Sequence, residues 1–178
     1  MPLYFAFLRG INVGGHRVKM HDLQLLFESL GFTEVESVIQ SGNIIFQSPD
    51  SDTPALEQKI EQHLKDALGY QVATFLRTAQ ELKSIARQQP FESVDHLVDA
   101  VVYAILLRDR PKADVKEALK KLNTENDELS VKNREVYWLR RVRCKESEIV
   151  GIQVGKILGA ESTSRNMTTL RKIADKYS

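Results

Sequence analysis

Apolar residues follow two different spacings in the first half of the chain. Residues 3–8 (LYFAFL) form an unbroken apolar run, which is typical of a strand covered on both faces. From Met20 to Leu30, apolar residues recur at every third or fourth position, as on one face of a helix. The spacing of apolar residues and the turn and capping residues predict a hairpin, a helix and a strand over residues 34–47, 53–68 and 71–77. The resulting order β-α-β-β-α-β is that of a split βαβ, or ferredoxin-like, unit.

The second half of the chain repeats most of this order. A capping-box pattern from Thr78 to Glu81 predicts the start of a helix that ends before Pro90. The later elements are predicted as a strand, a helix, a hairpin and two C-terminal helices over residues 97–107, 112–122, 127–140, 148–158 and 166–177. We therefore expect an α+β fold of two ferredoxin-like (split βαβ) halves in tandem with C-terminal helices. The halves, residues 1–77 and 78–178, are expected to pack as one compact unit.

Two polar segments that contain glycine are predicted to meet at one end of the first sheet. In a split βαβ unit the first two strands are parallel, and the third lies between them. The loop after strand one and the hairpin between strands two and three therefore leave the sheet at the same end. They would bring together an arginine, amide and hydroxyl side chains, and glycine amides that a ligand can approach closely. The predicted ligand-binding residues of the RGINVGG loop and the QSGN hairpin are Arg9, Asn12, Gly14, Gly15, Gln40, Ser41 and Asn43.

A purely structural role explains the spacing of this loop equally well. In that alternative the loop is a turn rich in glycine, and Arg9 pairs with a carboxylate such as Asp22. The sequence contains neither the dinucleotide pattern G-x-G-x-x-G nor a phosphate loop of the form G-x-x-x-x-G-K-[ST]. A further candidate anion site is Arg165 with Asn166, beside the predicted start of the last helix. There the alternative is an ordinary helix capped by Ser164 or Asn166.

Charge and composition narrow the classes of function. A formal net charge of +1 argues against a protein that packs nucleic acid through many phosphate contacts. Residues 1–77 hold 6 Lys or Arg against 9 Asp or Glu, whereas residues 78–178 hold 19 against 15, so the second half favours an anion more. Cys144 is the only cysteine, and no signal peptide or membrane-length apolar segment is found, which predicts a cytoplasmic protein without membrane contact. The four histidines form no i, i+4 pair, so no metal site is expected.

A basic and aromatic segment supports an alternative function. Residues 137–145 (YWLRRVRCK) interleave rings and cations, a pattern that can stack bases and bind phosphates. This predicts a module that binds RNA or single-stranded nucleic acid. The structural alternative, which the near-neutral charge favours, is a strand with Tyr137 or Trp138 in the core and its arginines in solvent. A third hypothesis is a protein-interaction domain whose open sheet face forms a homodimer.

Four motifs give the chain a family resemblance. FLRGINVGGHRVKM, LFESLGF, VIQSGNIIF and TSRNMTTLRKI occur in this order, and together they resemble the bacterial domain of unknown function 1697 family. The resemblance implies a duplicated α+β fold of ferredoxin-like halves, and it implies no established activity or cofactor. The family pattern falls on Arg9, Gly10, Asn12, Gly14, Gly15, Gln40, Ser41, Gly42, Asn43, Thr163, Arg165 and Asn166. The chain departs from that pattern over residues 141–147 and at Met167, where the family has tryptophan.

The sequence thus favours a protein that binds a small anionic or nucleotide-like ligand where the RGINVGG loop meets the QSGN hairpin. The recurrence of both motifs in one family supports a functional role for the loop. No general base is identified among these residues, so the prediction concerns binding and names no reaction.

Overall fold

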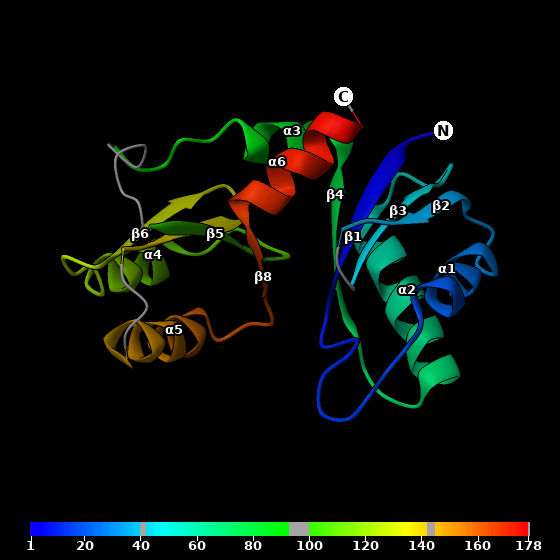
Figure 1. Cartoon of the computed structure of the whole chain (residues 1–178), viewed down its shortest axis with the longest axis horizontal. Helices are drawn as coiled ribbons and strands as arrows, with labels where there is room; N and C mark the ends of the chain where they lie inside the picture. Colours follow the sequence, from blue (N-terminus) through cyan, green and yellow to red (C-terminus); the bar gives the residue numbers. More distant parts are fainter. Residues whose placement is uncertain (40–41, 93–99, 142–144, 178) are drawn as a thin grey trace. The chain divides into compact units, whose positions relative to one another are not determined.

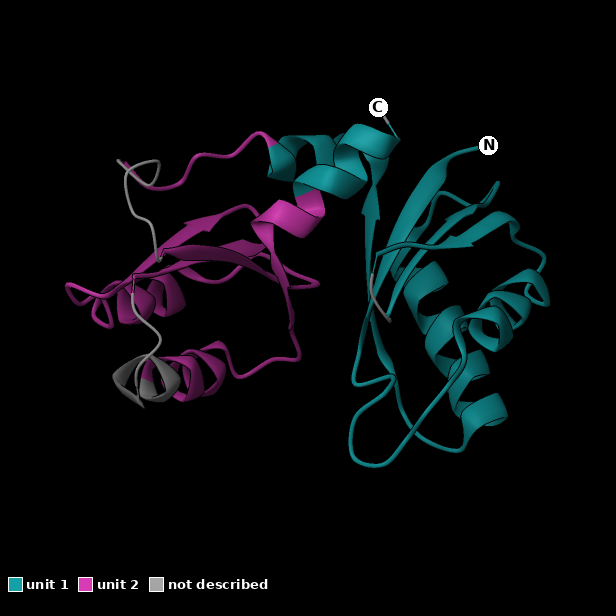
Figure 2. Cartoon of the chain, in the orientation of Figure 1, with its two compact units in different colours: residues 1–86, 171–178 teal, residues 87–170 magenta. Residues whose placement is uncertain are grey.

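The computed structural model describes residues 1–39, 42–92, 100–141 and 145–177, with the backbone course alone for residues 145–149 (Figure 1). The chain divides into two compact units, Met1–Ala86 with Arg171–Ser178 and Arg87–Leu170 (Figure 2). The helix after the fourth strand belongs to the first unit, whereas the division expected from element order places it in the second half.

The first unit contains a four-stranded antiparallel sheet with the strand order β2-β3-β1-β4. Its elements are β1 Leu3–Arg9, α1 Met20–Glu28, β2 Thr33–Ser37, β3 Asn43–Gln47, α2 Thr53–Leu68, β4 Ala73–Thr78 and α3 Ala79–Ala86. Strands β1 and β2 are parallel to each other, because both run antiparallel to β3 between them. This is the predicted split βαβ arrangement.

The ends of two helices confirm local signals in the sequence. Helix α2 begins at Thr53 as predicted, although the side chain that caps it belongs to Asp52, which accepts from the Ala55 amide at 3.1 Å. At the start of α3, the Thr78 amide donates to Glu81 at 2.9 Å, and the Glu81 amide donates to the Thr78 hydroxyl at 3.2 Å. The predicted capping box is therefore present.

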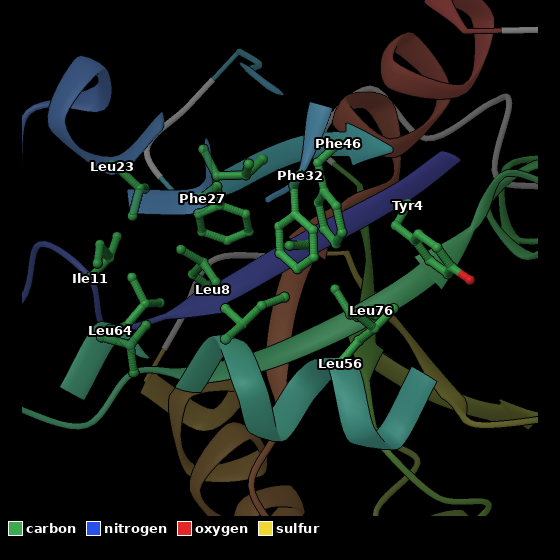
Figure 3. Packing of buried hydrophobic residues seen from close by; sticks show 14 residues of the cluster. Tyr4, Leu8, Ile11, Leu23, Phe27, Phe32, Phe46, Leu56, Leu64 and Leu76 are labelled. Carbon is green, nitrogen blue, oxygen red and sulfur yellow. The ribbon is translucent and has the colours of Figure 1, made fainter. Parts of the chain in front are cut away.

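The core of the first unit lies between one face of the sheet and helices α1 and α2 (Figure 3). Side chains alternate along β1, so Tyr4 and Leu8 point toward the helices. The rings of Phe32 and Phe46 stack with their centroids 4.3 Å apart, and Phe27 packs against both. Burial of each such side chain stabilises the fold by roughly 1.5–3 kcal/mol. The core thus fixes β1, and with it the origin of the loop that follows β1.

Carboxylates bind the backbone amides on the outer edge of β4. Glu57 and Glu61 of α2 accept from the amides of Leu76 and Thr74 at 2.8 and 2.7 Å. Glu81 of α3 continues the row at the last residue of β4. The amides of the strand are therefore satisfied without a fifth strand.

The second unit repeats the order of the first in a sheet β6-β7-β5-β8, again antiparallel throughout. Its elements are β5 Val101–Leu106, α4 Ala113–Lys120, β6 Asp127–Lys132, β7 Glu135–Arg140, α5 Lys145–Leu158 and β8 Thr163–Asn166, followed by α6 Met167–Lys176, whose last residues belong to the first unit. On the helix side of this sheet, Ile105 and Leu107 pack with Leu119 of α4 and Val154 of α5. The molecule is thus an α+β protein of two similar halves.

Strand β8 corrects the sequence interpretation. Residues 162–166 are predicted as a connection that caps the last helix, but residues 163–166 form a strand along β5. The segment TSRN is short and polar, so it carries no alternating apolar pattern. It becomes a strand because of tertiary pairing, with Thr163 opposite Leu106 and Asn166 opposite Tyr103.

The C-terminal residues are tied to β2 within the first unit. Lys176 and Tyr177 both donate to the carboxylate of Glu36, and the Tyr177 ring meets Phe5 edge-on at 5.8 Å. The hydrogen bond from Lys176, with that from Tyr177, holds the pKa of Glu36 below its ordinary value of 4.5. The same bond to Glu36 raises the pKa of Lys176.

Candidate functional site

The loop after β1 is fixed by contacts with the connection between α2 and β4. The side chain of Ile11 is 3% exposed, and the Tyr70 hydroxyl donates to the Ile11 carbonyl at 2.8 Å. The rings of His16 and Tyr70 stack with centroids 3.7 Å apart and an interplanar angle of 19°. The loop therefore has a defined path, anchored at two points by one tyrosine.

Polar groups of the loop also hold the loop together. The Asn12 side-chain oxygen accepts from the Val18 amide at 2.7 Å, which closes the glycine segment into a turn. Gly14 and Gly15 have φ values of +67° and +86°, which residues with a side chain adopt only with strain. A Cβ at either position would have no atom within 4 Å, so the space beside this backbone is open.

The hairpin between β2 and β3 lies beside the end of β1, from which the loop starts. The Leu8 amide donates to the Gly42 carbonyl at 2.7 Å, and Phe7 is paired with Asn43. Asn43 is 2% exposed, and its amide group donates to the Val38 carbonyl at 3.3 Å. Its side chain thus braces the hairpin. The predicted residues Gln40 and Ser41 lie outside the described residues.

Ile39 of the hairpin combines an unusual backbone with an exposed side chain. Its φ is +63°, which is a rare conformation for a β-branched residue and costs about 1–3 kcal/mol. The side chain is 54% exposed, and Val13 in the neighbouring loop is 68% exposed. The loop and the hairpin thus each expose one aliphatic side chain in addition to their polar groups.

Arg9 is the cationic side chain closest to the strand end. Side chains alternate along a strand, so Arg9, two residues after Phe7, lies on the same face of the sheet as Phe7 and its partner Asn43. The Arg9 side chain is exposed and forms no hydrogen bond or ion pair with any residue that the structure describes, Asp22 included. The paired arginine of the structural alternative is therefore not found.

Residues 9–21 contain three Lys or Arg and no Asp or Glu. The three, Arg9, Arg17 and Lys19, are all exposed. We call the loop from Arg9 to Lys19, together with hairpin residues 38–39 and 42–43, the first-strand site. The loop offers three exposed cations, among them the Arg9 guanidinium, beside a glycine backbone with open space around it, and these features suit an anionic group.

The other predicted anion-binding residues lie in the second unit, on β8. The Arg165 guanidinium donates to the Thr163 hydroxyl at 2.7 Å and to the Ser164 carbonyl at 2.9 Å. Burial lowers the pKa of Arg165 to about 10, so the group stays charged at neutral pH. Asn166 accepts from the Thr168 amide at 2.9 Å and caps α6, as the sequence suggested. Both side chains hold local structure.

The strand registers of the two units place arginines at matching positions. Leu8 donates to the residue before β3, and Leu107 donates in the same way to the residue before β7 at 3.0 Å. Arg9 and Arg108 therefore correspond, and each follows a leucine. On the fourth strands, Arg77 stands opposite Phe5 as Arg165 stands opposite Ala104. This correspondence was not predicted from the sequence, although the first strands of the two units are followed by or end in the similar triplets FLR and LLR.

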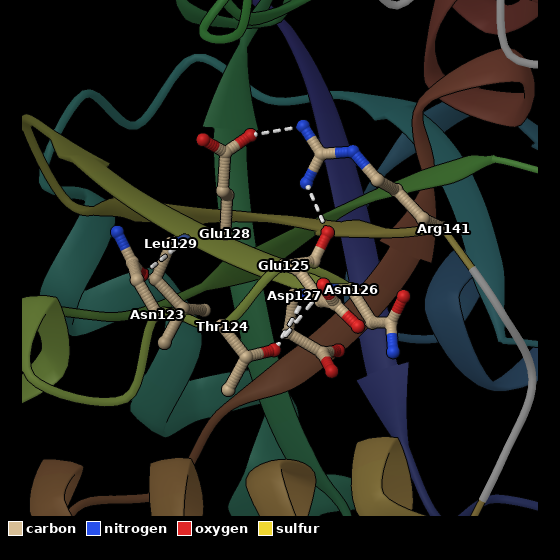
Figure 4. A network of polar contacts seen from close by, with 8 residues as sticks. All are labelled: Asn123, Thr124, Glu125, Asn126, Asp127, Glu128, Leu129 and Arg141. Carbon is tan, nitrogen blue, oxygen red and sulfur yellow. Dashed lines mark hydrogen bonds and ion pairs between the residues drawn. The ribbon is translucent and has the colours of Figure 1, made fainter.

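The described arginines of the basic and aromatic segment are held inside the second unit. Arg140 lies over the ring of Trp138, 4.9 Å from its centroid. Arg141 forms an ion pair with Glu128 at 2.7 Å and donates to the Glu125 carbonyl (Figure 4). Residues 142–144 lie outside the described residues. The two arginines thus stabilise a turn and a strand. The structural alternative expected both in solvent, but each is half-buried.

Neither a metal-binding cluster nor a membrane-spanning helix is found among the described residues. No group of three or more His, Cys, Asp and Glu side chains is placed to hold a metal ion. Within the same part of the chain, no helix has the length and apolar character needed to cross a membrane.

The fold and the first-strand site define a class of two-unit α+β proteins with a glycine-rich loop after the first strand. Residues 1–137 match the family model described as "Protein of unknown function (DUF1697)", so the chain belongs to this family, which confirms the family resemblance; the first three motifs lie within the match. The conserved bacterial protein SP0830 from Streptococcus pneumoniae has the same fold, with a TM-score of 0.77 and 23% sequence identity over 99% of this chain and 98% of that chain. No curated relative matches the sequence.

Proposed function

We propose that the protein binds a small anionic, nucleotide-like ligand at the first-strand site. The proposal rests on Arg9, the last residue of the paired strand β1. Its guanidinium is exposed and has no hydrogen-bond or ion-pair partner among the residues that the structure describes. Because an arginine presents a planar fork of donors, it can hold a phosphate or carboxylate through two parallel hydrogen bonds. Arg17 and Lys19 add positive charge that attracts the same group.

The paired rings of the loop support the nucleotide-like part of the proposal. One face of the His16 ring rests on Tyr70, and the His16 side chain is exposed. The outer face of this ring can stack on a nucleobase, and exposed Val13 and Ile39 can cover its apolar edge.

Asn12 and Asn43 act as positioning residues in this proposal, because their side chains already hold the loop and the hairpin. Arg165 and Asn166 are left out of the site, since their side chains hold β8 and the start of α6. The same reasoning leaves Arg140 and Arg141 without a proposed nucleic-acid role.

Titration calorimetry with inorganic phosphate, AMP and ADP tests the proposal. We expect AMP or ADP to bind more tightly than phosphate, and Arg9→Ala to weaken binding by about tenfold to a hundredfold, since a charge-assisted pair contributes about 1.5–3 kcal/mol. Arg9→Lys keeps the charge and loses the fork, so its affinity should fall between the two.

Arg87→Ala is the matched control, because Arg87 is an exposed arginine outside the site. An Arg9→Ala protein with the affinity of the wild type, or a wild type that binds none of the three probes, would refute the proposal.

A further inference from the structure

A cavity of about 470 Å³ opens at the end of the second sheet that corresponds to the first-strand site. It lies between the segment Leu107–Lys112 after β5, the first turn of α4, and Leu158 at the end of α5 with Ala160 and Glu161 before β8. We call it the β5 cavity. Its volume is within the range of about 300–1,000 Å³ that is usual for sites of small organic ligands.

The walls of the β5 cavity are partly apolar. Leu107, Val115 and Leu158 line it, and the last two are only half-buried, so aliphatic surface faces the open space. Pro111 adds a rigid apolar side. Because water in a concave aliphatic surface is readily displaced by apolar groups, this lining favours a ligand with an apolar body.

The rim of the cavity is charged, and its charges balance. Three basic and three acidic side chains line it: Arg108, Arg110, Lys112, Asp109, Asp114 and Glu161. Two of these side chains, Arg108 and Glu161, form an ion pair at 3.4 Å. Arg134 donates to the Arg108 carbonyl at 3.2 Å, which holds this side of the rim in place.

The other four rim charges form no ion pair with any residue in the described part of the chain. They are two cations, Arg110 and Lys112, and two carboxylates, Asp109 and Asp114, and all are exposed. A ligand of one sign would meet as much repulsion as attraction here, whereas a ligand with both signs can pair with each. This separates the β5 cavity from the first-strand site, whose loop has cations alone.

We infer that the β5 cavity binds a small zwitterion with an apolar body, of the class of an aliphatic amino acid or a short peptide. The carboxylate of the ligand pairs with Arg110 and Lys112, its ammonium group pairs with Asp109 and Asp114, and its side chain packs on the aliphatic wall. The inference is independent of the proposed function, because it concerns other residues and a different ligand.

Methyl-resolved NMR titration tests this inference on the whole chain. The probes are L-leucine, leucyl-leucine and N-acetyl-L-leucine amide, in which both charges are removed. We expect the two zwitterions to shift the methyl signals of Leu107, Val115 and Leu158, and the neutral derivative to leave them in place. The Arg110→Ala and Asp114→Asn variants should each weaken the interaction by about tenfold.

Lys121→Ala is the control, since Lys121 is an exposed cation at the end of α4 and lies outside the cavity lining. Unshifted wall methyls with both zwitterions at about 1 mM would overturn the inference. Equal binding of the neutral derivative would overturn it as well, as would affinities that survive both charge-removing variants. The methyl spectrum of each free variant verifies that it is folded.

Discussion

The hydroxyl of Tyr70 is a single atom through which the path of the β1 loop can be tested. Tyr70→Phe keeps the ring that stacks on His16 and removes only the donor to the Ile11 carbonyl, at 2.8 Å. One such hydrogen bond contributes about 0.5–1.5 kcal/mol net, and a carbonyl left without a donor at a buried residue raises the loss toward about 1–3 kcal/mol. Since Ile11 is 3% exposed, we expect a loss of about 1–2 kcal/mol.

Native-state hydrogen exchange locates this loss. The Val18 amide, which is bound by Asn12, reports on opening of the loop, and its exchange should accelerate by about fivefold to thirtyfold in Tyr70→Phe. Amides in the middle of β1 should be much less affected, because the loop can open while the sheet stays formed. Phosphate or nucleotide affinity should fall in parallel if the loop is part of the proposed site.

Tyr4→Phe provides the matched control for this experiment. Tyr4 also donates to a backbone carbonyl at 2.8 Å, that of Asp50, but it lies at the other end of β1. The reasoning fails if Val18 exchanges at the same rate in Tyr70→Phe as in the wild type, or if Tyr4→Phe accelerates it equally.

Two further predictions concern the stability of the first unit. Glu57→Ala leaves a β4 amide without its acceptor, so urea unfolding should show a loss of about 1.5–3 kcal/mol, and an unchanged midpoint would contradict the assigned bond. Because Lys176 and Tyr177 lower the pKa of Glu36, its contribution is present above pH 4.5 and is lost as the pH falls through the lowered value. The difference in melting temperature between wild type and Glu36→Gln should therefore shrink in acid, and a constant difference from pH 6 to about pH 3 would refute this linkage.

The order of elements was predictable because each strand and helix of the first unit carries its own spacing. Examples are the apolar run of residues 3–8, the helical face that begins at Met20 and the glycine that ends α2. Each signal lies within a few neighbouring residues and agrees with the structure that the segment adopts in the fold. The hairpin of residues 127–140 was placed for the same reason. Strand β8 was missed because its pairing with β5 is a property of the sheet and not of the segment TSRN.

The arrangement of the strands around the candidate site was predictable, and the contacts of its side chains were less so. The strand order alone places the β2–β3 hairpin beside the end of β1, where the loop begins. Sequence spacing could not decide whether Arg9 pairs with Asp22 or faces solvent, because spacing does not fix the direction in which a side chain points. Nor could it assign Tyr70 to the loop, since 59 residues separate that side chain from Ile11. Asn43 is buried because it is the first residue of β3 and pairs with the buried Phe7 of β1.

The row of carboxylates along β4 limits how this molecule can associate with others. An open strand edge is the usual entry point for a peptide that adds to a sheet, and for the mispairing that leads to fibrils. At β4 an incoming strand would have to compete with Glu57 and Glu61 for the amides and expel the helix that carries them. The same helix contributes Leu56, Ile60 and Leu64 to the hydrophobic core, so exposing this edge would require opening the first unit itself.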